Sequence, residues 1–387
     1  MRYSAIYFFC FLLLVTIGCK KPYNPPVIAN VPNYLVVEGT ILSGADSTII
    51  KLSRTVSLSN GTPPKPVSQA TLTVESNANS TFPLTEIKPG SYASPGLNLD
   101  NTKQYRLRIV TSDNQVYLSD FVPLQVTPPI DSIGFSVLNN GIELYVNSHD
   151  PNNNTRYYRW DYAETWEFHA KFFSSDITDG KQLLPRNPDQ YVYYCFAGDV
   201  SSTILLGSSA KLTQDVIYQS PLGFIPSTSE KIETEYSILL HQYALTNEAF
   251  TFWTNLKKNT EQLGSIFDAE PSQINGNIHN TGNPKEPVFG YISASTVQSK
   301  RVFIYNTQLP REWVPNYPYD CEVDSLLIKQ PISMVNQVQE YLIPLGSSEL
   351  AISPIYVQNS IVGYTAAGRT CADCSIRGVV QPPSFWQ

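Results

Sequence analysis

Short segments in which apolar and polar residues alternate, with turn residues between them, constrain the fold of this chain most. The alternation is clearest over residues 70–74 and 105–109. A period of two places the apolar side chains on one face of a β-strand and the polar ones on the other. Turn signals such as Asn60-Gly61 and Pro89-Gly90 separate these segments. This pattern predicts an antiparallel β-sandwich, immunoglobulin-like or transthyretin-like, over residues 33–127.

The chain then enters a second region that is also rich in strands. Pro128 and Pro129 end the first unit, because proline cannot donate a hydrogen bond to a β-ladder. We expect a larger β-rich domain over residues 128–387. Its expected strands cover residues 142–146, 157–162, 191–196, 204–206, 232–243, 288–294 and 302–305.

One segment of this second domain has a helical pattern. Thr246 is a good N-cap, Phe250 and Trp253 recur at near-helical spacing, and Gly264 can close the end. We predict a helix over residues 247–263 whose aromatic face packs on the second sheet. A helix that docks into a partner protein is the alternative.

The N-terminus indicates where the protein works. A single basic residue, Arg2, precedes an apolar run that ends in Gly18-Cys19. The run is too short for a stable transmembrane helix, and a small residue before cysteine is where a lipoprotein signal peptidase cuts. We predict that residues 1–18 are a signal peptide and that Cys19 is the lipidated N-terminus. An ordinary secretory signal or an uncleaved anchor is the alternative, because Thr16 stands where Leu is usual.

Composition limits the partners of the mature chain. Residues 19–32 are rich in proline and predict an extended tether, which reaches about 40 Å at ~3.1 Å per residue. The net charge of the chain is -7, and only 15% of its residues are charged. Lys20-Lys21 and Lys257-Lys258 are the largest basic clusters, so nucleic acid is not expected as a partner. The 24 Tyr and 29 Pro residues are typical of an extracytoplasmic β protein.

The cysteines predict disulfide bonds. Once Cys10 leaves with the signal and Cys19 takes the lipid, four remain: Cys195, Cys321, Cys371 and Cys374. In an oxidising compartment this even number predicts two disulfides, with three connectivities open, whereas a redox or zinc site lacks its usual context. We expect Cys371 or Cys374 to bond to Cys321 or Cys195, because closing a loop of about 50 residues stabilises by roughly 4 kcal/mol and a CxxC ring gains much less. Trp386 would then be held against the second domain.

No motif fixes a reaction, a metal or a cofactor. The chain has no G-x-S-x-G, P-loop or dinucleotide fingerprint. Residues 150–154 resemble the start of a calcium loop, but Thr155 stands where glycine is required, so we expect an Asx turn without an ion. No zincin-type metal site is expected, because the four histidines are never at i, i+4 spacing: His149, His169, His241 and His279. No catalytic histidine can be nominated either, since His169 and His241 fall in predicted strands, where an imidazole with a structural role is favoured over a ligand or base.

The densest acidic and aromatic group lies over residues 161–168, a composition suited to a sugar-binding groove. The candidate ligand-contact residues are Trp160, Glu164, Trp166 and Glu167. On one strand, however, positions 164 and 167 face opposite sides, so we do not expect them to form an acid–base pair.

Several segments that are weak one by one follow a specific order along nearly the whole chain. They are Cys19 with Pro22-Tyr23, residues 35–39, 52–55, 90–92, 129–132, 158–160, 164–168, 264–268, 276–278 and 290–292, Cys371-Ala-Asp-Cys374, and Phe385-Trp386. Together they resemble the Bacteroidota outer-membrane lipoprotein family known as domain of unknown function 4249. The resemblance implies an envelope lipoprotein of unknown activity, encoded near a TonB-dependent outer-membrane receptor. It supplies no catalytic residues.

We therefore expect a non-catalytic binding or accessory lipoprotein whose partners are the membrane, through its lipid, and a TonB-dependent receptor in nutrient or ligand uptake. In surface-exported lipoproteins of that phylum, acidic residues follow the acylated cysteine, whereas Lys20 and Lys21 follow Cys19 here. We therefore expect attachment to the outer membrane, and the choice between its periplasmic and surface leaflets stays open. One alternative is an enzyme acting on glycans or peptides, which a cleft gathering Asp161, Glu164 and Glu167 would favour. The other is a structural envelope scaffold.

Overall fold

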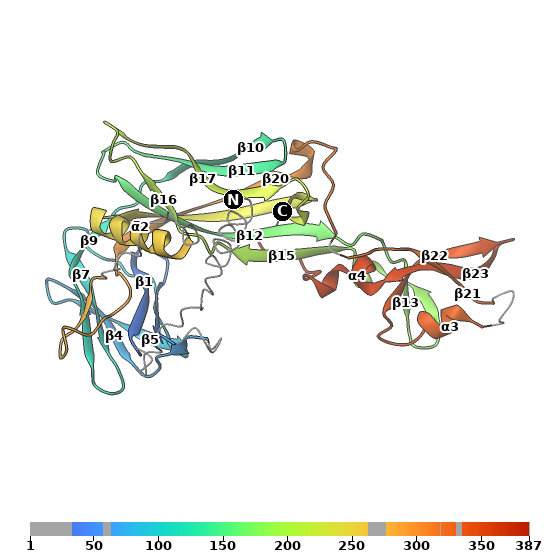
Figure 1. Cartoon of the computed structure of the whole chain (residues 1–387), viewed down its shortest axis with the longest axis horizontal. Coiled ribbons are helices and arrows are strands. Elements are labelled where there is room, and N and C mark those ends of the chain that lie inside the picture. Colours follow the sequence, from blue (N-terminus) through green and yellow to red (C-terminus); the bar gives the residue numbers. More distant parts are fainter. Residues whose placement is uncertain (1–32, 57–62, 262–275, 318, 330–334, 387) are drawn as a thin grey trace, which may run out of the picture.

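The computed structural model describes residues 33–56, 63–261, 276–317, 319–329 and 335–386. Strands form about half of this part of the chain and surround three hydrophobic cores. Figure 1 shows the corresponding lobes, the first at lower left, the second above it and the third at far right. The expected signal peptide, the tether and Cys19 lie outside the described residues. No described helix has both the length and the apolarity needed to cross a membrane.

Alternating burial builds the first lobe. In β7, Tyr105, Leu107 and Ile109 are buried, whereas Arg106 and Arg108 between them are half-buried. The ladder runs β1-β2-β6-β5-β4-β7-β8, and its buried side chains share one core. This confirms the predicted N-terminal β-sandwich. The strands are β1 (Leu35–Ser43), β2 (Thr48–Arg54), β3 (Lys65–Pro66), β4 (Thr71–Ser76), β5 (Thr81–Lys88), β6 (Ser91–Ser94), β7 (Gln104–Val110), β8 (Val116–Ser119) and β9 (Val122–Gln125).

The first lobe also contains a segment from far along the chain, which corrects the predicted boundary at residue 127. β19 (Ile278–Asn280) pairs with β8, and the start of β20 (Ala294–Tyr305) pairs in parallel with β1 and β9. Ile292, between them, is buried in the first core. The strand predicted over residues 288–294 is instead mostly loop. A three-residue strand has too few positions to show a period, so the sequence pattern could not reveal this return.

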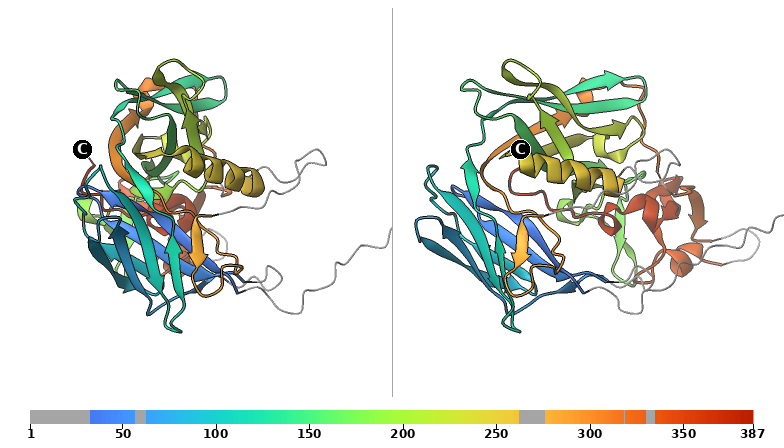
Figure 2. Two further views of the ribbon diagram at one scale, coloured as in Figure 1. Left: turned by 90° about the vertical axis from the view of Figure 1, so that its left-hand side faces the viewer. Right: turned by 60° about the vertical axis from the view of Figure 1, so that its left-hand side comes forward.

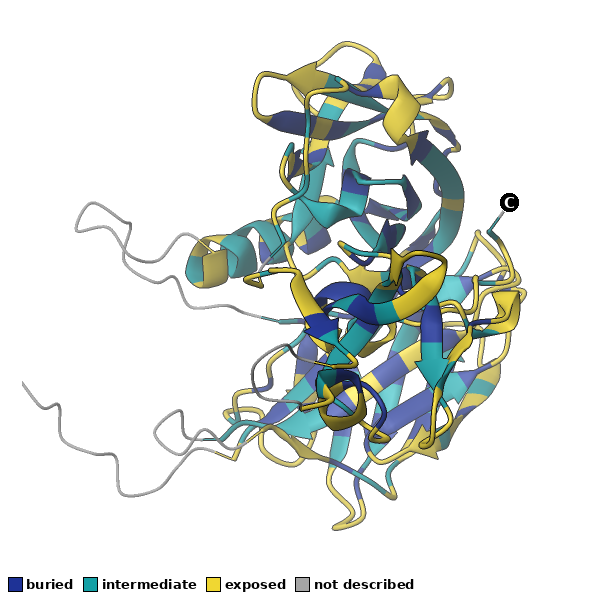
Figure 3. Cartoon of the chain, turned by 90° about the vertical axis from the view of Figure 1, so that its right-hand side faces the viewer, coloured by how far each residue is buried: buried dark blue, intermediate teal, exposed yellow. Residues whose placement is uncertain are grey.

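The core of the second lobe lies between two facing sheets. One is the three-stranded sheet β10-β11-β17, and the other runs β15-β12-β18-β20. Val146 of β11, Trp160 of β12 and Ile238 of β18 are among the buried side chains that fill the space between them. Figure 3 shows buried residues inside the lobes and exposed ones on the outer hairpins. The strands are β10 (Ile130–Leu138), β11 (Gly141–Asp150), β12 (Tyr157–His169), β15 (Tyr194–Val200), β16 (Leu205–Ser208), β17 (Asp215–Pro226) and β18 (Glu235–Leu245).

Strand β20 joins the first two lobes. Its first residues pair in parallel with β1, and residues 297–305 pair antiparallel with β18. One continuous hydrogen-bonded sheet of 15 strands therefore extends from the second lobe into the first. The relative placement of the two lobes is held by backbone hydrogen bonds as well as by side chains.

The predicted helix is confirmed as α2 (Asn247–Glu261), and positions 262 and 263 lie outside the described residues. The backbone N–H of Ala249 donates to the Oγ1 of Thr246 at 3.2 Å, so Thr246 caps the first turn. The Phe250 ring packs 4.9 Å from the ring of Tyr157 on β12. The aromatic face therefore lies on the second sheet as expected, and Figure 2 shows the helix along the side of this lobe.

The third lobe corrects the prediction of a single domain over residues 128–387. It combines the β13–β14 hairpin with the sheet β21-β23-β22 from much later in the chain, around a separate core that includes Leu342 and Ala366. Neither the hairpin nor the three-stranded sheet is large enough to bury a core alone. Because they lie far apart in the chain, their association could not be predicted from the sequence. Its elements are β13 (Asp176–Thr178), β14 (Leu183–Pro185), β21 (Asp324–Leu327), α3 (Gln337–Tyr341), β22 (Glu349–Val357), β23 (Ser360–Gly368) and α4 (Arg369–Ala372). Short 3-10 turns cover Pro188–Gln190, Glu230–Ile232, Asn306–Gln308 and Cys374–Ile376.

Two disulfides tie the C-terminal region to the body of the protein. Cys195 of β15 bonds to Cys374, and Cys321 bonds to Cys371. Both cysteines of the CxxC segment thus pair outside it, which confirms the prediction that at least one of them does. The ring of Trp386 lies 5.0 Å from that of Phe196 and 5.4 Å from that of Phe303, so the C-terminal tryptophan packs on the second lobe as predicted.

Candidate functional site

A groove lies between the first and second lobes, beside α2. It consists of two adjoining hollows with volumes of about 600 Å³ and about 390 Å³. Both are lined by Glu38 of β1, Lys51 of β2, and Arg159 and Asp161 of β12. These volumes fall in the range of small-molecule sites. We name this feature the interlobe groove.

The register between β12 and β18 determines which polar side chains lie together at the groove. Arg159 and Asp161 stand at alternate positions on β12, on the side opposite the buried Trp160. Their cross-strand partners on β18 are Tyr243 and His241. Because neighbours on one face of a sheet lie close together, these four side chains form one cluster.

Arg159 is held between two aromatic rings. Its guanidinium carbon lies 4.4 Å from the ring centre of Tyr243 and 4.9 Å from that of Trp253 on α2. Its Nη1 lies 3.3 Å from Oδ2 of Asp161. A cation that contacts two aromatic faces and a carboxylate has little rotational freedom, so the wall is formed before any ligand arrives.

Asp161 connects the cluster. Its Oδ1 lies 3.0 Å from Nδ1 of His241, while its Oδ2 contacts Arg159. Burial, and then the negative charge of Asp161, raise the pKa of the Tyr243 hydroxyl well above its ordinary value. Tyr243 is therefore protonated at neutral pH. The groove presents aromatic surface together with fixed hydrogen-bonding groups, and it holds no pair of free carboxylates on β12 and β18.

The sequence-predicted ligand-contact residues do not form one surface. Trp160 belongs to the wall of the groove but is 1% exposed, and its Nε1 donates to Oε1 of Gln242 at 2.8 Å. Glu164, Trp166 and Glu167 are not among the residues that line the interlobe groove. Trp160, Glu164 and Trp166 share one face of β12, and the sheet formed by β10, β11 and β17 covers that face.

The acidic residues of β12 have separate surroundings. Glu164 is buried and contacts Lys231, and its Oε2 accepts a hydrogen bond from the Tyr236 hydroxyl at 2.8 Å. Glu167 faces the other way, where burial and then the charge of Glu235 raise the pKa of its carboxyl. Glu164, Glu167 and Asp161 are therefore dispersed, and no cleft gathers them as an enzyme site would require.

Asp150 forms the predicted Asx turn. Its carboxylate accepts hydrogen bonds from the backbone N–H groups of Asn152, Asn154 and Thr155 at 2.9, 2.8 and 2.9 Å. Burial opposes ionisation, but these hydrogen bonds outweigh it and hold the pKa of Asp150 below its ordinary value. Within the described ranges, no three His, Cys, Asp or Glu side chains are grouped so that they could hold a metal ion.

Each histidine has a carboxylate neighbour. The pairs are His149 with Asp131 at 2.8 Å, His169 with Glu233 at 3.1 Å, His241 with Asp161 at 3.0 Å and His279 with Asp120 at 3.6 Å. Sequence reasoning missed the importance of His241 and Arg159, because cross-strand register cannot be read from one strand alone.

Together, the fold and the groove define a mainly β protein of three lobes with a polar and aromatic groove between two of them. The family described as Domain of unknown function (DUF4249) matches residues 20–301, more than half of the 387 residues, and the chain belongs to this family. No curated protein matches the chain. A two-domain fibronectin type III segment from chicken tenascin is 11% identical and covers 56% of this chain and 93% of its own length, with a TM-score of 0.18, which is too low to define the fold.

Proposed function

We propose that this protein is an envelope lipoprotein that binds a ligand in the interlobe groove and acts as a non-catalytic partner of a TonB-dependent outer-membrane receptor. The observation that carries the binding role is the arrangement of Arg159 between Tyr243 and Trp253, with Asp161 linking it to His241. Such a wall is ready for a ligand at little ordering cost. The signal pattern ending in Cys19 supports the envelope location.

Binding is favoured over catalysis by the partners of the ionisable groups. Asp161 is paired with Arg159 and contacts His241, and Glu164 is paired with Lys231. A general acid and a general base on one substrate would have to converge, but the acidic residues of β12 are dispersed over two faces. The mixture of aromatic surface and fixed polar groups suits a hydroxyl-bearing ligand such as an oligosaccharide.

Oligosaccharide titration monitored by tryptophan fluorescence tests the ligand role, because Trp253 lines the groove. We expect a saturable change that Arg159→Ala reduces by about tenfold in affinity, since it removes the charge and frees both rings. Lys88→Ala, at an exposed position of β5, is the control and should bind as the wild type does. Equal affinity in Arg159→Ala and the wild type would place the ligand elsewhere.

The membrane and receptor roles need a separate experiment in cells. Palmitate labelling should mark the wild type and not Cys19→Ala, which should move to soluble fractions, because a lipid chain is the expected anchor. Label retained in Cys19→Ala would refute lipidation at this residue. Affinity purification of the tagged wild type from outer membranes should bring a TonB-dependent receptor with it, and its repeated absence would refute the accessory role.

A further inference from the structure

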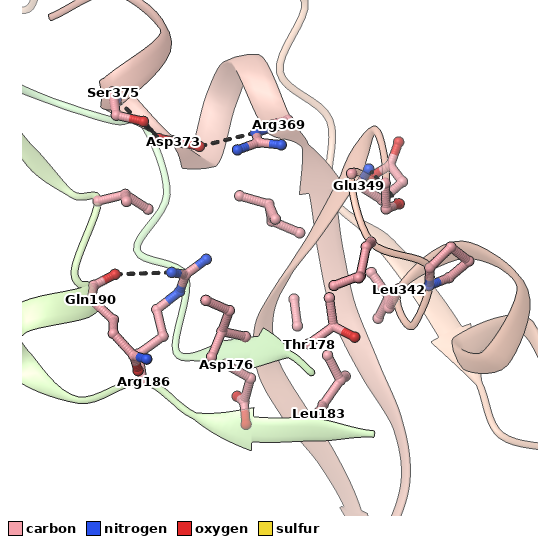
Figure 4. Close-up of a pocket in the computed structure, with 18 residues that line it drawn as sticks. Asp176, Thr178, Leu183, Arg186, Gln190, Leu342, Glu349, Arg369, Asp373 and Ser375 are labelled. Carbon is pink, nitrogen blue, oxygen red and sulfur yellow. Dashed lines mark hydrogen bonds and ion pairs between the residues drawn. The ribbon is translucent and has the colours of Figure 1, made fainter. Parts of the chain in front are cut away.

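A second cavity, remote from the interlobe groove, lies where the third lobe meets the second. Its volume is about 380 Å³, and it is enclosed by the β13–β14 hairpin, β22 and α4 (Figure 4). Cys371 belongs to α4, which supplies the lining residue Arg369, and Cys374 lies between the lining residues Asp373 and Ser375 in the sequence. We name it the two-arginine pocket after Arg186 and Arg369.

Arg186 is the unusual group in this pocket. Arg186 directly follows the last residue of β14 and is only 9% exposed. Its Nη1 donates to the backbone oxygen of Gln190 at 2.9 Å, and its Nε donates to Oγ of Ser174 at 3.3 Å. Within the described part of the chain, no carboxylate lies within 4.0 Å of this guanidinium, and its Nη2 has no hydrogen-bond partner. A largely buried cation that contacts no carboxylate directly carries a desolvation cost, which a bound anion would reduce.

Arg369 supplies a second cation on the opposite side of the cavity. Its Nε lies 3.0 Å from Oδ2 of Asp373, and Figure 4 shows its terminal nitrogens directed toward the cavity. The other oxygen of Asp373 accepts hydrogen bonds from the backbone and hydroxyl of Ser375. Both carboxylate oxygens of Asp373 therefore have other partners, and Asp373 does not form a direct ion pair with Arg186. Burial and the nearby positive charge of Arg369 lower the pKa of Arg186, whereas the negative charges of Asp373 and Asp176 raise it.

The rest of the pocket is largely apolar. Leu183 of β14, Leu342 after α3, Leu345, and Leu350 and Ala351 of β22 line it. Glu349 is also present, but burial and then the charge of Asp324 raise the pKa of its carboxyl, which favours the neutral form. The cavity therefore combines two guanidinium groups, with the carboxylates of Asp176 and Asp373 nearby, and an apolar wall.

We propose that the two-arginine pocket binds a small amphipathic carboxylate, with its carboxylate between Arg186 and Arg369 and its hydrocarbon part along the leucines. Guanidinium groups match the geometry of a carboxylate, and charge-assisted hydrogen bonds are about twice as strong as neutral ones. The apolar wall favours a carboxylate with a hydrocarbon tail over a free inorganic anion. The proposal concerns a site separate from the groove and does not rest on the function proposed for it.

Titration calorimetry with octanoate tests this site, using the unlipidated Cys19→Ala chain. We expect octanoate to bind with one-to-one stoichiometry, and 1-octanol to bind at least about tenfold more weakly because it lacks the charge. Arg186→Gln should weaken octanoate binding by about tenfold or more, and Arg369→Gln by a smaller factor because Arg369 is more exposed. Lys181→Gln removes a charge from the turn of the same hairpin, outside the lining, and should change nothing.

A further variant keeps the test valid if Arg186→Gln fails to fold. Leu345 is 75% exposed at the rim, so Leu345→Glu should fold normally while its negative charge weakens octanoate binding. Equal binding of octanoate and 1-octanol, unchanged binding in Arg369→Gln and Leu345→Glu, or inorganic phosphate binding as tightly as octanoate would each overturn the proposal. Loss of saccharide binding in the groove would leave this result unaffected.

Discussion

Cys195 and Cys374 are joined by a disulfide across 179 residues, so the C-terminal segment is fixed directly to β15 of the second lobe. Both cysteines are fully buried, and the Trp386 that follows packs on Phe196, the neighbour of Cys195. The second disulfide, Cys321 to Cys371, closes a shorter loop of 50 residues in sequence separation. The segment from Cys374 to Trp386 is therefore fixed to the second lobe at both of these residues.

The two disulfides should differ in what their removal costs. In the chain-entropy relation, the 179-residue loop stabilises by about 5 kcal/mol and the 50-residue loop by about 4 kcal/mol. We expect the double change Cys195→Ser and Cys374→Ser to lower the urea unfolding midpoint more than Cys321→Ser with Cys371→Ser, and both to increase proteolysis near the C-terminus. Non-reducing peptide mapping checks the pairing itself, and a Cys371–Cys374 bridge would contradict it.

The Asx turn at Asp150 should make stability depend on pH in the acid range. Its pKa is lower in the folded protein than in the unfolded chain, so ionised Asp150 stabilises the fold above its unfolded pKa. This stabilisation should disappear as the pH falls through the lower, folded value. Asp150→Ala should cost about 1–3 kcal/mol at neutral pH, because three backbone donors lose their partner. Urea unfolding at several pH values measures this, with the exposed Asp46→Ala as control; equal losses in both variants would show that the turn contributes nothing.

His149 should titrate with a midpoint above that of an ordinary histidine. The hydrogen bond with Asp131, and then the negative charge of Asp131, raise the pKa of the His149 imidazole. Any stabilisation from this pair is therefore present at low pH and is lost as the pH rises through the folded pKa. NMR titration of the imidazole protons should show the shift in the wild type and its loss in Asp131→Asn. A midpoint that does not change in Asp131→Asn would mean that the pair is absent in solution.

Sequence patterns could not predict which segments pair when they lie far apart in the chain. Local patterns identified β7, β11, β12 and α2, because each is long enough to show its own period. The same patterns could not place Ile278 in the first core or join Asp176 to the sheet β21-β23-β22, since these contacts depend on segments far apart in sequence. The groove was missed for a related reason: the pairing of Arg159 with Tyr243 and of Asp161 with His241 is a matter of register between strands.

The return of the chain to the first lobe should depend on Gly290. Its φ is +136°, and a Cβ atom there would lie 2.1 Å from the backbone oxygen of Val37 in β1. Gly44, after β1, has a similar φ of +121°, but a Cβ atom there would meet no other atom within 4 Å. Gly290→Ala therefore adds a backbone clash to the conformational strain, whereas Gly44→Ala adds the strain alone, about 1–3 kcal/mol.

We expect Gly290→Ala to destabilise the protein by clearly more than Gly44→Ala, because the clash forces residues 288–292 away from β1 and exposes apolar side chains of the first core. Val288 and Ile292 are both buried there, and full burial of such a side chain contributes about 1.5–3 kcal/mol each. Urea unfolding gives the size of the effect, and hydrogen exchange locates it: the amide of Val37, which donates to the backbone oxygen of Phe289 at 2.8 Å, should lose protection in Gly290→Ala and keep it in Gly44→Ala. Equal stability and equal protection in the two variants would show that this segment does not hold the first lobe together.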